Sequence, residues 1–327
     1  MEVVSAAIKP KGRIVTQFLE YFAPLLFPEK SELISEARKI LEDDKRRIKE
    51  DEFLSLDDAL ELFYDGICRQ NPEFRTVLCV APDLKRKSQP YRIALRTLEG
   101  YVDGINLRIY GDVNPIETLR DNNVNFAIAS SDLLLAKFIS LIPRGTDVRD
   151  SGKILSCLPE DTTTMEYGFP LNINQARHML ITNFPADISV REDGIPLPEE
   201  GVEIAVNGEY YLIYSRIFNG RRYRLTEGEK VEPFVLRRDG MKKYGIEIVS
   251  SGRTLIEESK RNGSGLAVCR NPVYESSGII LLNDARREGS GSYRKIVSLI
   301  REMNQQIKTP EETTTAFMEK NLERYLI

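Results

Sequence analysis

The sequence predicts an α/β protein in which a helical N-terminal region precedes two α/β lobes. Three observations support this fold class. Residues 1–75 carry apolar side chains at three- and four-residue spacing after a short start, which is typical of amphipathic helices. From residue 76 onward, short β-branched runs alternate with helical segments, as in the βαβ units of a parallel sheet. Residues 246–255 form an apolar strand that leads through a glycine turn directly into a helix.

These patterns divide the chain into four segments. We expect an N-terminal helical extension, the first part of one α/β lobe, a second lobe that contains an inserted hairpin and a phosphate loop, and a return strand with C-terminal helices. The corresponding ranges are 1–75, 76–150, 151–265 and 266–327.

The elements of each segment follow from local signals. Ser55, followed by acidic residues, is expected to cap the last helix of the extension. The first lobe is predicted to contain the strand TVLCVAP, a helix over residues 90–100, the strand GINLRIYG, a helix that begins at Asn114-Pro115, and the strand VNFAIAS. In the second lobe, KILSCLP is predicted to be a strand. The hairpin is expected around residues 202–228, because two Asn-Gly pairs there favour tight turns.

Composition excludes several classes of function. The chain has 327 residues, 41% of them hydrophobic and 29% charged, with a net charge of -4 and a pI near 5.5. That balance gives no bulk electrostatic basis for binding nucleic acid or a membrane surface. No apolar run approaches the about 20 residues needed to span a bilayer, and the N-terminus is too polar for a signal peptide. We therefore expect a cytoplasmic protein.

Cysteine and histidine usage argues against a metal centre built by the protein. The four cysteines are scattered without a C-x-x-C pair, so they suggest neither a disulfide framework nor a zinc site and are expected to be reduced core residues; they are Cys68, Cys79, Cys157 and Cys269. His178 is the single histidine, which excludes a multi-histidine site. It precedes an apolar strand-like run, so a structural role is expected.

The strongest local signal is the turn after the strand at 246–249. A helix N-terminus presents unpaired N–H groups and a positive dipole end, and a glycine lets backbone amides close around a phosphate. Glu247 lies three residues before the turn, where a carboxylate can accept hydrogen bonds from a ribose diol. An ordinary capped helix would explain the serines and the threonine as well, but the position of Glu247 favours phosphate binding. The predicted phosphate-binding residues are Ser250, Ser251, Gly252, Arg253 and Thr254.

Residues 240–255, GMKKYGIEIVSSGRTL, resemble the phosphoribosyl-pyrophosphate signature of the ATP phosphoribosyltransferases of histidine biosynthesis. Four further segments resemble parts of the same family in the same order along the chain. They are VNFAIASSDLLL, ARHMLITNFP, Lys230-Val231-Glu232, and VYESSGIILLND with the helix after it. The series covers roughly residues 76–307, so the chain resembles a divergent member of the catalytic core.

The resemblance implies a two-lobed fold like that of type II periplasmic binding proteins. It implies a glycosyltransferase that joins N1 of the adenine of ATP to phosphoribosyl pyrophosphate and releases pyrophosphate. Mg²⁺ is expected to bind mainly through the pyrophosphate of the donor. Ser250–Thr254 would hold the 5-phosphate and Glu247 the ribose hydroxyls, while Ser130, Ser131 and Asp132 would lie near the acceptor. Such a reaction needs alignment and charge stabilisation more than a dedicated base.

Two segments compete to supply the cations for pyrophosphate. The family carries Pro-Lys-Gly-Arg after its first strand, and Pro10–Arg13 is this tetrapeptide, although it lies upstream of the helical region. Lys85 and Arg86 are a looser match that follows a cleaner strand. The second pair is preferred as the catalytic cations, and Lys11 and Arg13 stay open as the alternative.

Departures from the family pattern leave other functions open. Glu247 replaces an aspartate, and Lys242-Lys243 replaces Ala-Asp. The same donor could therefore serve an acceptor other than ATP in another pathway, or the chain could be a non-catalytic nucleotide-binding or regulatory homologue. The tail is too short for the family's regulatory domain, so a homo-oligomer or a separate regulatory subunit is the expected partner, besides small-molecule substrates.

Overall fold

The computed structural model describes residues 3–49, 54–83, 91–144, 146, 148–149, 154, 156–157, 165–184, 188–198, 201–218, 223–225, 231–236, 243–249, 252–283, 291–307 and 320–327. The chain forms two compact units, each assembled from three segments. Unit 1 comprises Met1–Ala129, Glu160–Asn174 and Gly278–Ile307, and unit 2 comprises Ser130–Pro159, Gln175–Ser277 and Lys308–Ile327. Both units are α/β, as the sequence predicts. None of the helices in these described ranges is long and apolar enough to cross a membrane.

Unit 1 is built around strand β1 (Val3–Ile8). It pairs in parallel with β5 (Ile105–Gly111) on one side and with β6 (Phe126–Ser130) on the other, and β4 (Thr97–Val102) pairs antiparallel with β5 at the edge. Five of the six β1 residues and all five β6 residues are buried, which is typical of parallel strands covered on both faces.

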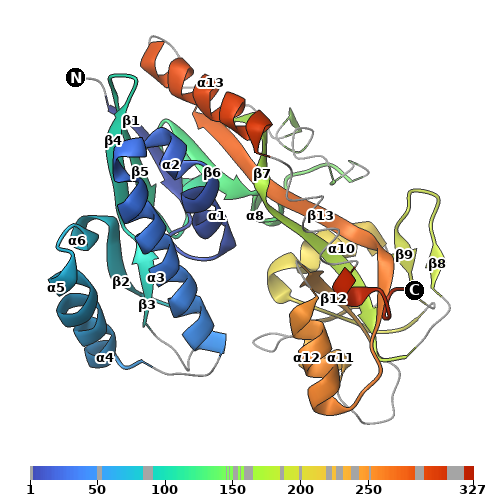
Figure 1. Ribbon diagram of the computed structural model, residues 1–327. Coiled ribbons are helices and arrows are strands. Elements are labelled where there is room, and N and C mark those ends of the chain that lie inside the picture. Colours follow the sequence, from blue (N-terminus) through green and yellow to red (C-terminus); the bar gives the residue numbers. More distant parts are fainter. Residues whose placement is uncertain are drawn as a thin grey trace. The chain divides into compact units, whose positions relative to one another are not determined.

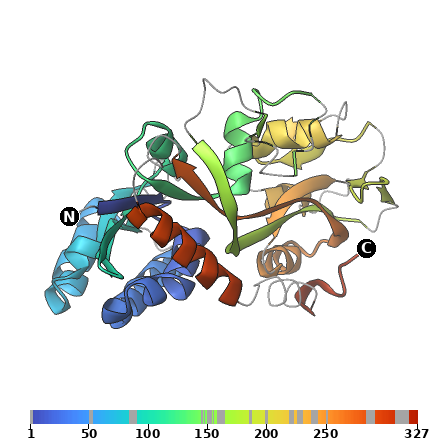
Figure 2. The ribbon, with the colours of Figure 1, turned by 90° about the horizontal axis from the view of Figure 1, so that it is seen from above.

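Helices of unit 1 cover this sheet. Among them, α1 (Arg13–Tyr21) packs against α3 (Ser31–Lys49), and α13 (Gly291–Gln306) packs on β1, where Figure 2 draws the red helix beside the dark-blue strand. The remaining helical elements are α2 (Ala23–Leu26), η1 (Pro28–Lys30), α4 (Leu56–Leu60), η2 (Glu61–Ile67), α5 (Cys68–Gln70), α6 (Phe74–Val77) and α7 (Pro115–Arg120). The predicted cap is confirmed: Ser55 Oγ accepts a hydrogen bond from the amide of Asp58 at 3.1 Å.

Two predictions for this part of the chain are corrected. The short start of the N-terminal region is the strand β1 and Met1–Ala129 lies in one unit, so residues 1–75 are not a separate helical extension. The helix expected over residues 90–100 is not found in the described residues 91–100, because β3 (Tyr91–Leu95) pairs antiparallel with β2 (Leu78–Pro82) and β4 follows it. The burial of β4 alternates with a period of two residues, as expected for a strand.

Unit 2 has its own part of the sheet. Strand β12 (Tyr244–Val249) pairs antiparallel with β7 (Met165–Thr182) and lies beside β10 (Ile204–Val206), which it joins in parallel. The helices are α8 (Ser131–Phe138), α10 (Tyr211–Phe218), α11 (Val231–Val235) and α12 (Arg253–Asn262), with η4 (Gly208–Tyr210) before α10; β8 (Ser189–Val190) and β9 (Pro196–Leu197) form a small separate sheet.

The expected hairpin in unit 2 is also corrected. Between β10 and β11 (Tyr223–Leu225) lies the helix α10, and the two strands are parallel. Asn207 does not make a hairpin turn; its side chain accepts from the amide of Glu209 at 2.9 Å and starts the helical segment. The second Asn-Gly pair lies outside the described residues. The predicted strand KILSCLP is described only at residues 154, 156 and 157, of which the first two are helical.

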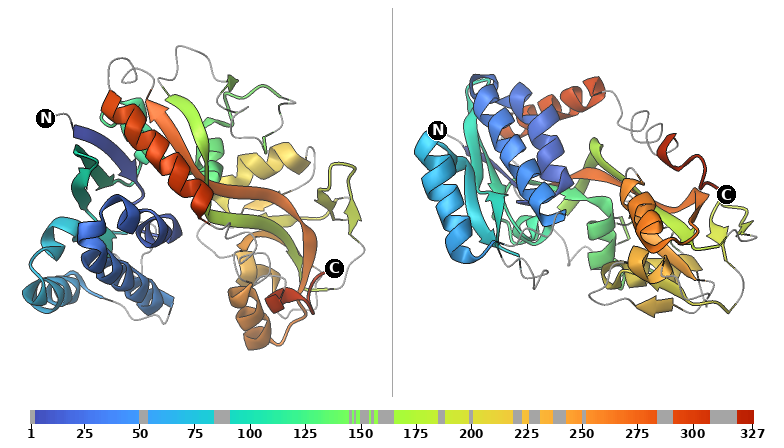
Figure 3. Two further views of the ribbon diagram at one scale, coloured as in Figure 1. Left: turned by 45° about the horizontal axis from the view of Figure 1, so that its top comes forward. Right: turned by 60° about the horizontal axis from the view of Figure 1, so that its bottom comes forward.

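Two long strands contribute residues to both units. They are β7 and β13 (Ala267–Asn283), which are neighbours in the sheet and run side by side in Figures 1 and 3. The α/β class and the division into two units, both predicted from the sequence, are thus observed, whereas the boundaries are set by long strands that the sequence did not reveal.

The end of β13 in unit 1 is held by Asn283. Its side-chain amide donates to Asn122 Oδ1 at 2.7 Å and to the carbonyl of Val124 at 3.1 Å, and its backbone N–H donates to the carbonyl of Asn125 at 3.0 Å. Asn283 is fully buried. The connection between α7 and β6 is therefore tied to β13 by a desolvated amide.

Replacing this amide tests its contribution. Asn283→Leu keeps the approximate volume but leaves buried acceptors without donors, so the free energy of unfolding should fall by about 2–4 kcal/mol. Chemical denaturation measures the change. Asn123→Leu, at an exposed position of the same connection, is the control and should change stability by less than about 0.5 kcal/mol. Equal effects of the two substitutions would contradict this role of Asn283.

Candidate functional site

The turn after β12 has the strand-turn-helix form that the sequence predicts. The strand ends at Val249 and α12 begins at Arg253. Gly252 is the N-cap with φ 71°, a left-handed conformation that glycine adopts at little cost. The amide of Ile256 donates to the carbonyl of Gly252 at 3.1 Å and closes the first helical turn.

The identity of this N-cap helps to distinguish an ordinary capped helix from a phosphate-binding turn. A glycine at the N-cap makes no side-chain hydrogen bond to the helix, so the cap itself is not one of the predicted hydroxyl residues. Ser250 and Ser251 lie outside the described residues, and Arg253 and Thr254 are described only in their backbone. The first amides of α12 are the groups that a helix N-terminus leaves without intrahelical acceptors.

Glu247 lies two residues before the end of β12. It is half-buried and pairs in register with Met179 on β7. Because side chains alternate along a strand, it shares a face with Gly245, and a Cβ at Gly245 would meet Val231 and Val235 of α11. The carboxylate is therefore on the α11 face of β12, in the strand that leads into the Gly252 turn.

The tetrapeptide Pro10–Arg13 begins two residues after the end of β1. Gly12 has φ 99° and is the N-cap of α1, which starts at Arg13. Lys11 Nζ lies 3.4 Å from Asp83 Oδ2 and donates to the carbonyl of Pro82 at 3.0 Å. Burial lowers the pKa of Lys11, although Asp83 acts in the opposite direction. The segment thus lies at a strand-to-helix junction of the sheet, not in a detached region.

Asp83 also belongs to a charge cluster of unit 1. Arg92 lies 3.0 Å from Asp44 and 3.6 Å from Asp83, and Asp44 is almost fully buried. The preferred cations, Lys85 and Arg86, follow Asp83 closely in sequence but lie outside the described residues.

The three residues predicted near the acceptor lie together at the start of α8. Ser130, Ser131 and Asp132 are 6%, 4% and 6% exposed. The hydroxyl of Ser130 donates to Asp132 Oδ1, and Ser131 Oγ accepts from the amide of Ser277 at 3.1 Å. These side chains are engaged within unit 2, so contact with an acceptor stays a prediction.

His178 forms a buried cluster with these residues. Its Nε2 lies 3.7 Å from Asp132 Oδ2, and its Nδ1 is 2.7 Å from the hydroxyl of Tyr214. The rings of Tyr210 and Tyr274 pack edge-on against the imidazole at 5.3 and 5.0 Å. His178 is fully buried, in agreement with its expected structural role. The sequence does not show that Asp132 is its neighbour, because the two residues are 46 positions apart.

The ionisation of this cluster follows from its surroundings. Burial acts to raise the pKa of Asp132, but His178, Ser130 and the amide of Leu133 together hold that pKa below its usual value. Burial, followed by the charge of Glu247, raises the pKa of Tyr214 well above its usual value. The cluster therefore contains a carboxylate that hydrogen bonds stabilise and a phenol that keeps its proton.

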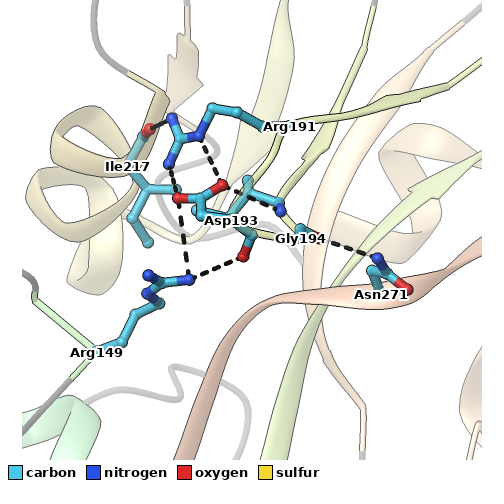
Figure 4. Close-up of polar contacts among 7 residues, drawn as sticks. Arg149, Arg191, Asp193, Gly194, Ile217 and Asn271 are labelled. Carbon is cyan, nitrogen blue, oxygen red and sulfur yellow. Dashed lines mark hydrogen bonds and ion pairs between the residues drawn. The ribbon is translucent and has the colours of Figure 1, made fainter.

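A second polar cluster lies at the turn between β8 and β9 (Figure 4). Arg191 binds Asp193 through both carboxylate oxygens, at 2.8 and 2.5 Å, and donates to the carbonyl of Ile217 at 3.0 Å. Arg149 donates to the carbonyl of Asp193 at 3.2 Å. The hydrogen bond from Arg191 lowers the pKa of Asp193 to about 2. These charges pair with one another and are partly exposed. The cluster therefore holds the β8–β9 turn in place through ion pairs.

Within the described part of the chain, no group of three or more histidine, cysteine, aspartate or glutamate residues could hold a metal ion.

The chain is similar to known proteins at the level of solved structures. No family model matches the chain, and no curated protein matches it. Among solved structures, it is similar to an ATP phosphoribosyl transferase (HisG:HisZ) complex from Thermotoga maritima, with 15% identity, 93% of this chain and 99% of that chain covered, and a TM-score of 0.41. It is also similar to a TRAP periplasmic solute-binding protein from Ochrobactrum anthropi, with 11% identity, 99% and 83% covered, and a TM-score of 0.48.

The buried cluster gives a stability prediction. Asp132→Asn should lower the free energy of unfolding at pH 7 by about 3 kcal/mol, because it breaks a buried charge arrangement. Because the pKa of Asp132 is lower in the folded than in the unfolded protein, its carboxylate stabilises the fold at pH values above the unfolded-state pKa of about 3.9. This contribution is lost as the pH falls toward the folded-state pKa. The difference between wild type and variant should therefore shrink below about pH 4. Asp65→Asn, at an exposed site, is the control. A difference that persists unchanged at pH 3 would contradict the prediction.

Proposed function

We propose that this chain is a phosphoribosyltransferase that uses phosphoribosyl pyrophosphate as its donor. The observation that carries the proposal is the geometry after β12: a left-handed glycine N-cap opens α12, and a half-buried carboxylate, Glu247, lies on the strand just before it. In this arrangement the backbone amides at the start of α12 bind the 5-phosphate of the sugar. Glu247 accepts hydrogen bonds from the two ribose hydroxyls.

The chemistry suits a site without a dedicated base. The lone pair of an acceptor nitrogen forms a bond to the anomeric carbon, and the bond from that carbon to the pyrophosphate oxygen breaks with its electron pair on the leaving group. The protein must hold donor and acceptor in line and stabilise the charge on pyrophosphate. Mg²⁺, when bound through the donor's pyrophosphate, supplies additional positive charge.

Two pairs of cations are proposed for the pyrophosphate. Lys85 and Arg86 are one pair. Lys11 and Arg13 are the other, and this second pair gains support because Pro10–Arg13 lies at the end of a central strand and at the start of α1. Anion binding by Lys11 would compete with its contact to Asp83.

The default acceptor is the N1 of the adenine of ATP, which makes histidine biosynthesis the proposed pathway. Ser130, Ser131 and Asp132 are proposed to lie near it. The side chains of these residues are already hydrogen-bonded inside unit 2 and are less available to bind ATP. The main alternative is therefore an acceptor other than ATP. Cytoplasmic location, small-molecule substrates, and assembly as a homo-oligomer or with a regulatory subunit complete the proposal.

A non-catalytic nucleotide-binding role is a second candidate. It is favoured by Lys243, which stands where the family signature has an acidic residue. Lys243 is 8% exposed, and its ammonium group lies 5.1 Å from the centre of the Phe234 ring. Lys243 directly precedes β12, so its buried ammonium group lies at the start of that strand, at the opposite end from the Gly252 turn. Calorimetry with ATP and with phosphoribosyl pyrophosphate distinguishes the two candidates, because binding without pyrophosphate release over a panel of acceptors would favour the non-catalytic one.

The role of Glu247 is tested by removing only its charge. Glu247→Gln should weaken binding of phosphoribosyl pyrophosphate with Mg²⁺ roughly 10- to 150-fold, because hydrogen bonds to a charged group contribute about 1.5–3 kcal/mol. Calorimetry measures the dissociation constant, and pyrophosphate release measures turnover. Glu257→Gln makes the same chemical change at an exposed position of α12 and should leave both unchanged. If the Glu247 variant binds the donor like wild type, the carboxylate does not hold the ribose.

The cations are distinguished by two matched variants. If Lys11 meets pyrophosphate, Lys11→Gln should reduce pyrophosphate release about tenfold or more, by loss of a charge-assisted contact, and Lys85→Gln should have little effect. The reverse result would support Lys85 and Arg86. Equal, small effects of both substitutions would argue against either segment as the cation source.

A further inference from the structure

Residues 320–327 form a short helical turn followed by an extended end, and they are anchored to β13. The amide of Val268 donates to the carbonyl of Tyr325 at 2.7 Å, the amide of Ile327 donates to the carbonyl of Val268 at 3.0 Å, and the amide of Arg270 donates to the carbonyl of Ile327 at 3.0 Å. A parallel bridge joins Val268 to Leu326. This segment therefore continues the sheet of unit 2 on the side of β13.

Leu322 is the point at which this segment meets the turn after β12. It is fully buried in a core cluster with Met179, Val249 and Leu255. A Cβ added to Gly252 would lie 2.5–2.7 Å from the Cγ and both Cδ atoms of Leu322. Figure 3 draws the red segment close to the orange helix α12. Leu322 thus occupies the space in which any other residue at position 252 would place its side chain.

Leu322 itself is held by the backbone of its own turn. Its carbonyl accepts from the amides of Tyr325 and Leu326, at 2.7 and 3.0 Å. Those two residues are the ones that approach β13. The position of Leu322 against Gly252 therefore depends on β13, which is not part of the β12–α12 connection. Residues distant in sequence thus restrain the turn.

We infer that Leu322 is a positioning residue that keeps the Gly252 turn in its left-handed conformation, so that residues 320–327 set the geometry of the proposed phosphate site. The inference rests on the proposed function of that turn. A glycine with positive φ has other accessible conformations when its surroundings do not restrict it. Without the isobutyl group of Leu322, the first amides of α12 would converge on a phosphate for only part of the time, and the apparent affinity would fall by that fraction.

The test compares two leucines of the same core cluster. Leu322→Ala and Leu236→Ala remove the same atoms from fully buried positions. The three atoms nearest to a Cβ at Gly252 all belong to Leu322 and none to Leu236. Leu322→Met preserves the contact with a flexible apolar side chain. Two quantities are measured: hydrogen exchange at the amide of Ile256, whose acceptor is the carbonyl of Gly252, and the dissociation constant of phosphoribosyl pyrophosphate with Mg²⁺.

For Leu322→Ala we expect hydrogen exchange at Ile256 to be about tenfold faster, and donor binding about tenfold weaker, than for Leu236→Ala. These values correspond to a turn that adopts the phosphate-binding conformation for roughly a tenth of the time. Leu322→Met should restore both. Equal exchange and equal affinity in the two alanine variants would overturn the inference. If wild type does not bind the donor, the proposed function fails, and exchange at Ile256 alone still decides whether Leu322 positions the turn.

Discussion

The left-handed backbone of Gly252 is the constraint on which the candidate site depends. One residue meets two requirements: as the N-cap it begins α12 in a left-handed conformation, and it leaves room for Leu322 to pack against its Cα. The hydrogen bonds of β12 to β7 and β10 place the strand before this turn. A flexible residue type is thereby fixed by its neighbours, so the amides at the start of α12 have a defined direction. Preorganisation of this kind is what makes anion binding by a backbone strong.

Much of the fold could be predicted from local patterns. The helices with long apolar periods, such as α3 and α13, and the buried runs of β5, β6 and β12 have signals that extend over several turns or a full strand. The failures are several short elements and the full length of the two long strands β7 and β13. Six residues, Val3–Ile8, form the strand at the centre of unit 1, and this short apolar run does not by itself distinguish a strand from the start of a helix. Asn207-Gly208 favours a hairpin locally, yet the apolar spacing of α10 determines the outcome.

The candidate site could be predicted where its residues are close in sequence. Glu247 and Gly252 belong to one strand-turn-helix segment, so their relation follows from spacing alone. The contacts of Asp132 with His178, and of Leu322 with Gly252, join residues 46 and 70 positions apart. Such contacts depend on strand pairing and have no local signal. Lys11 illustrates the same limit, because the sequence does not show that the strand before it pairs with β5 and β6.

The passage of β7 and β13 through both units has a consequence for how the chain is made. Each unit consists of three separated segments, so neither can be excised as one continuous fragment. During synthesis, residues 3–129 can form the part of the nine-stranded sheet that contains β4, β5, β1 and β6, but β6 lacks its neighbour β13 until residue 283 has left the ribosome. An unpaired buried strand is prone to wrong pairing and aggregation. Assembly in the cell therefore includes a long interval in which this nascent edge needs protection, for example by a chaperone.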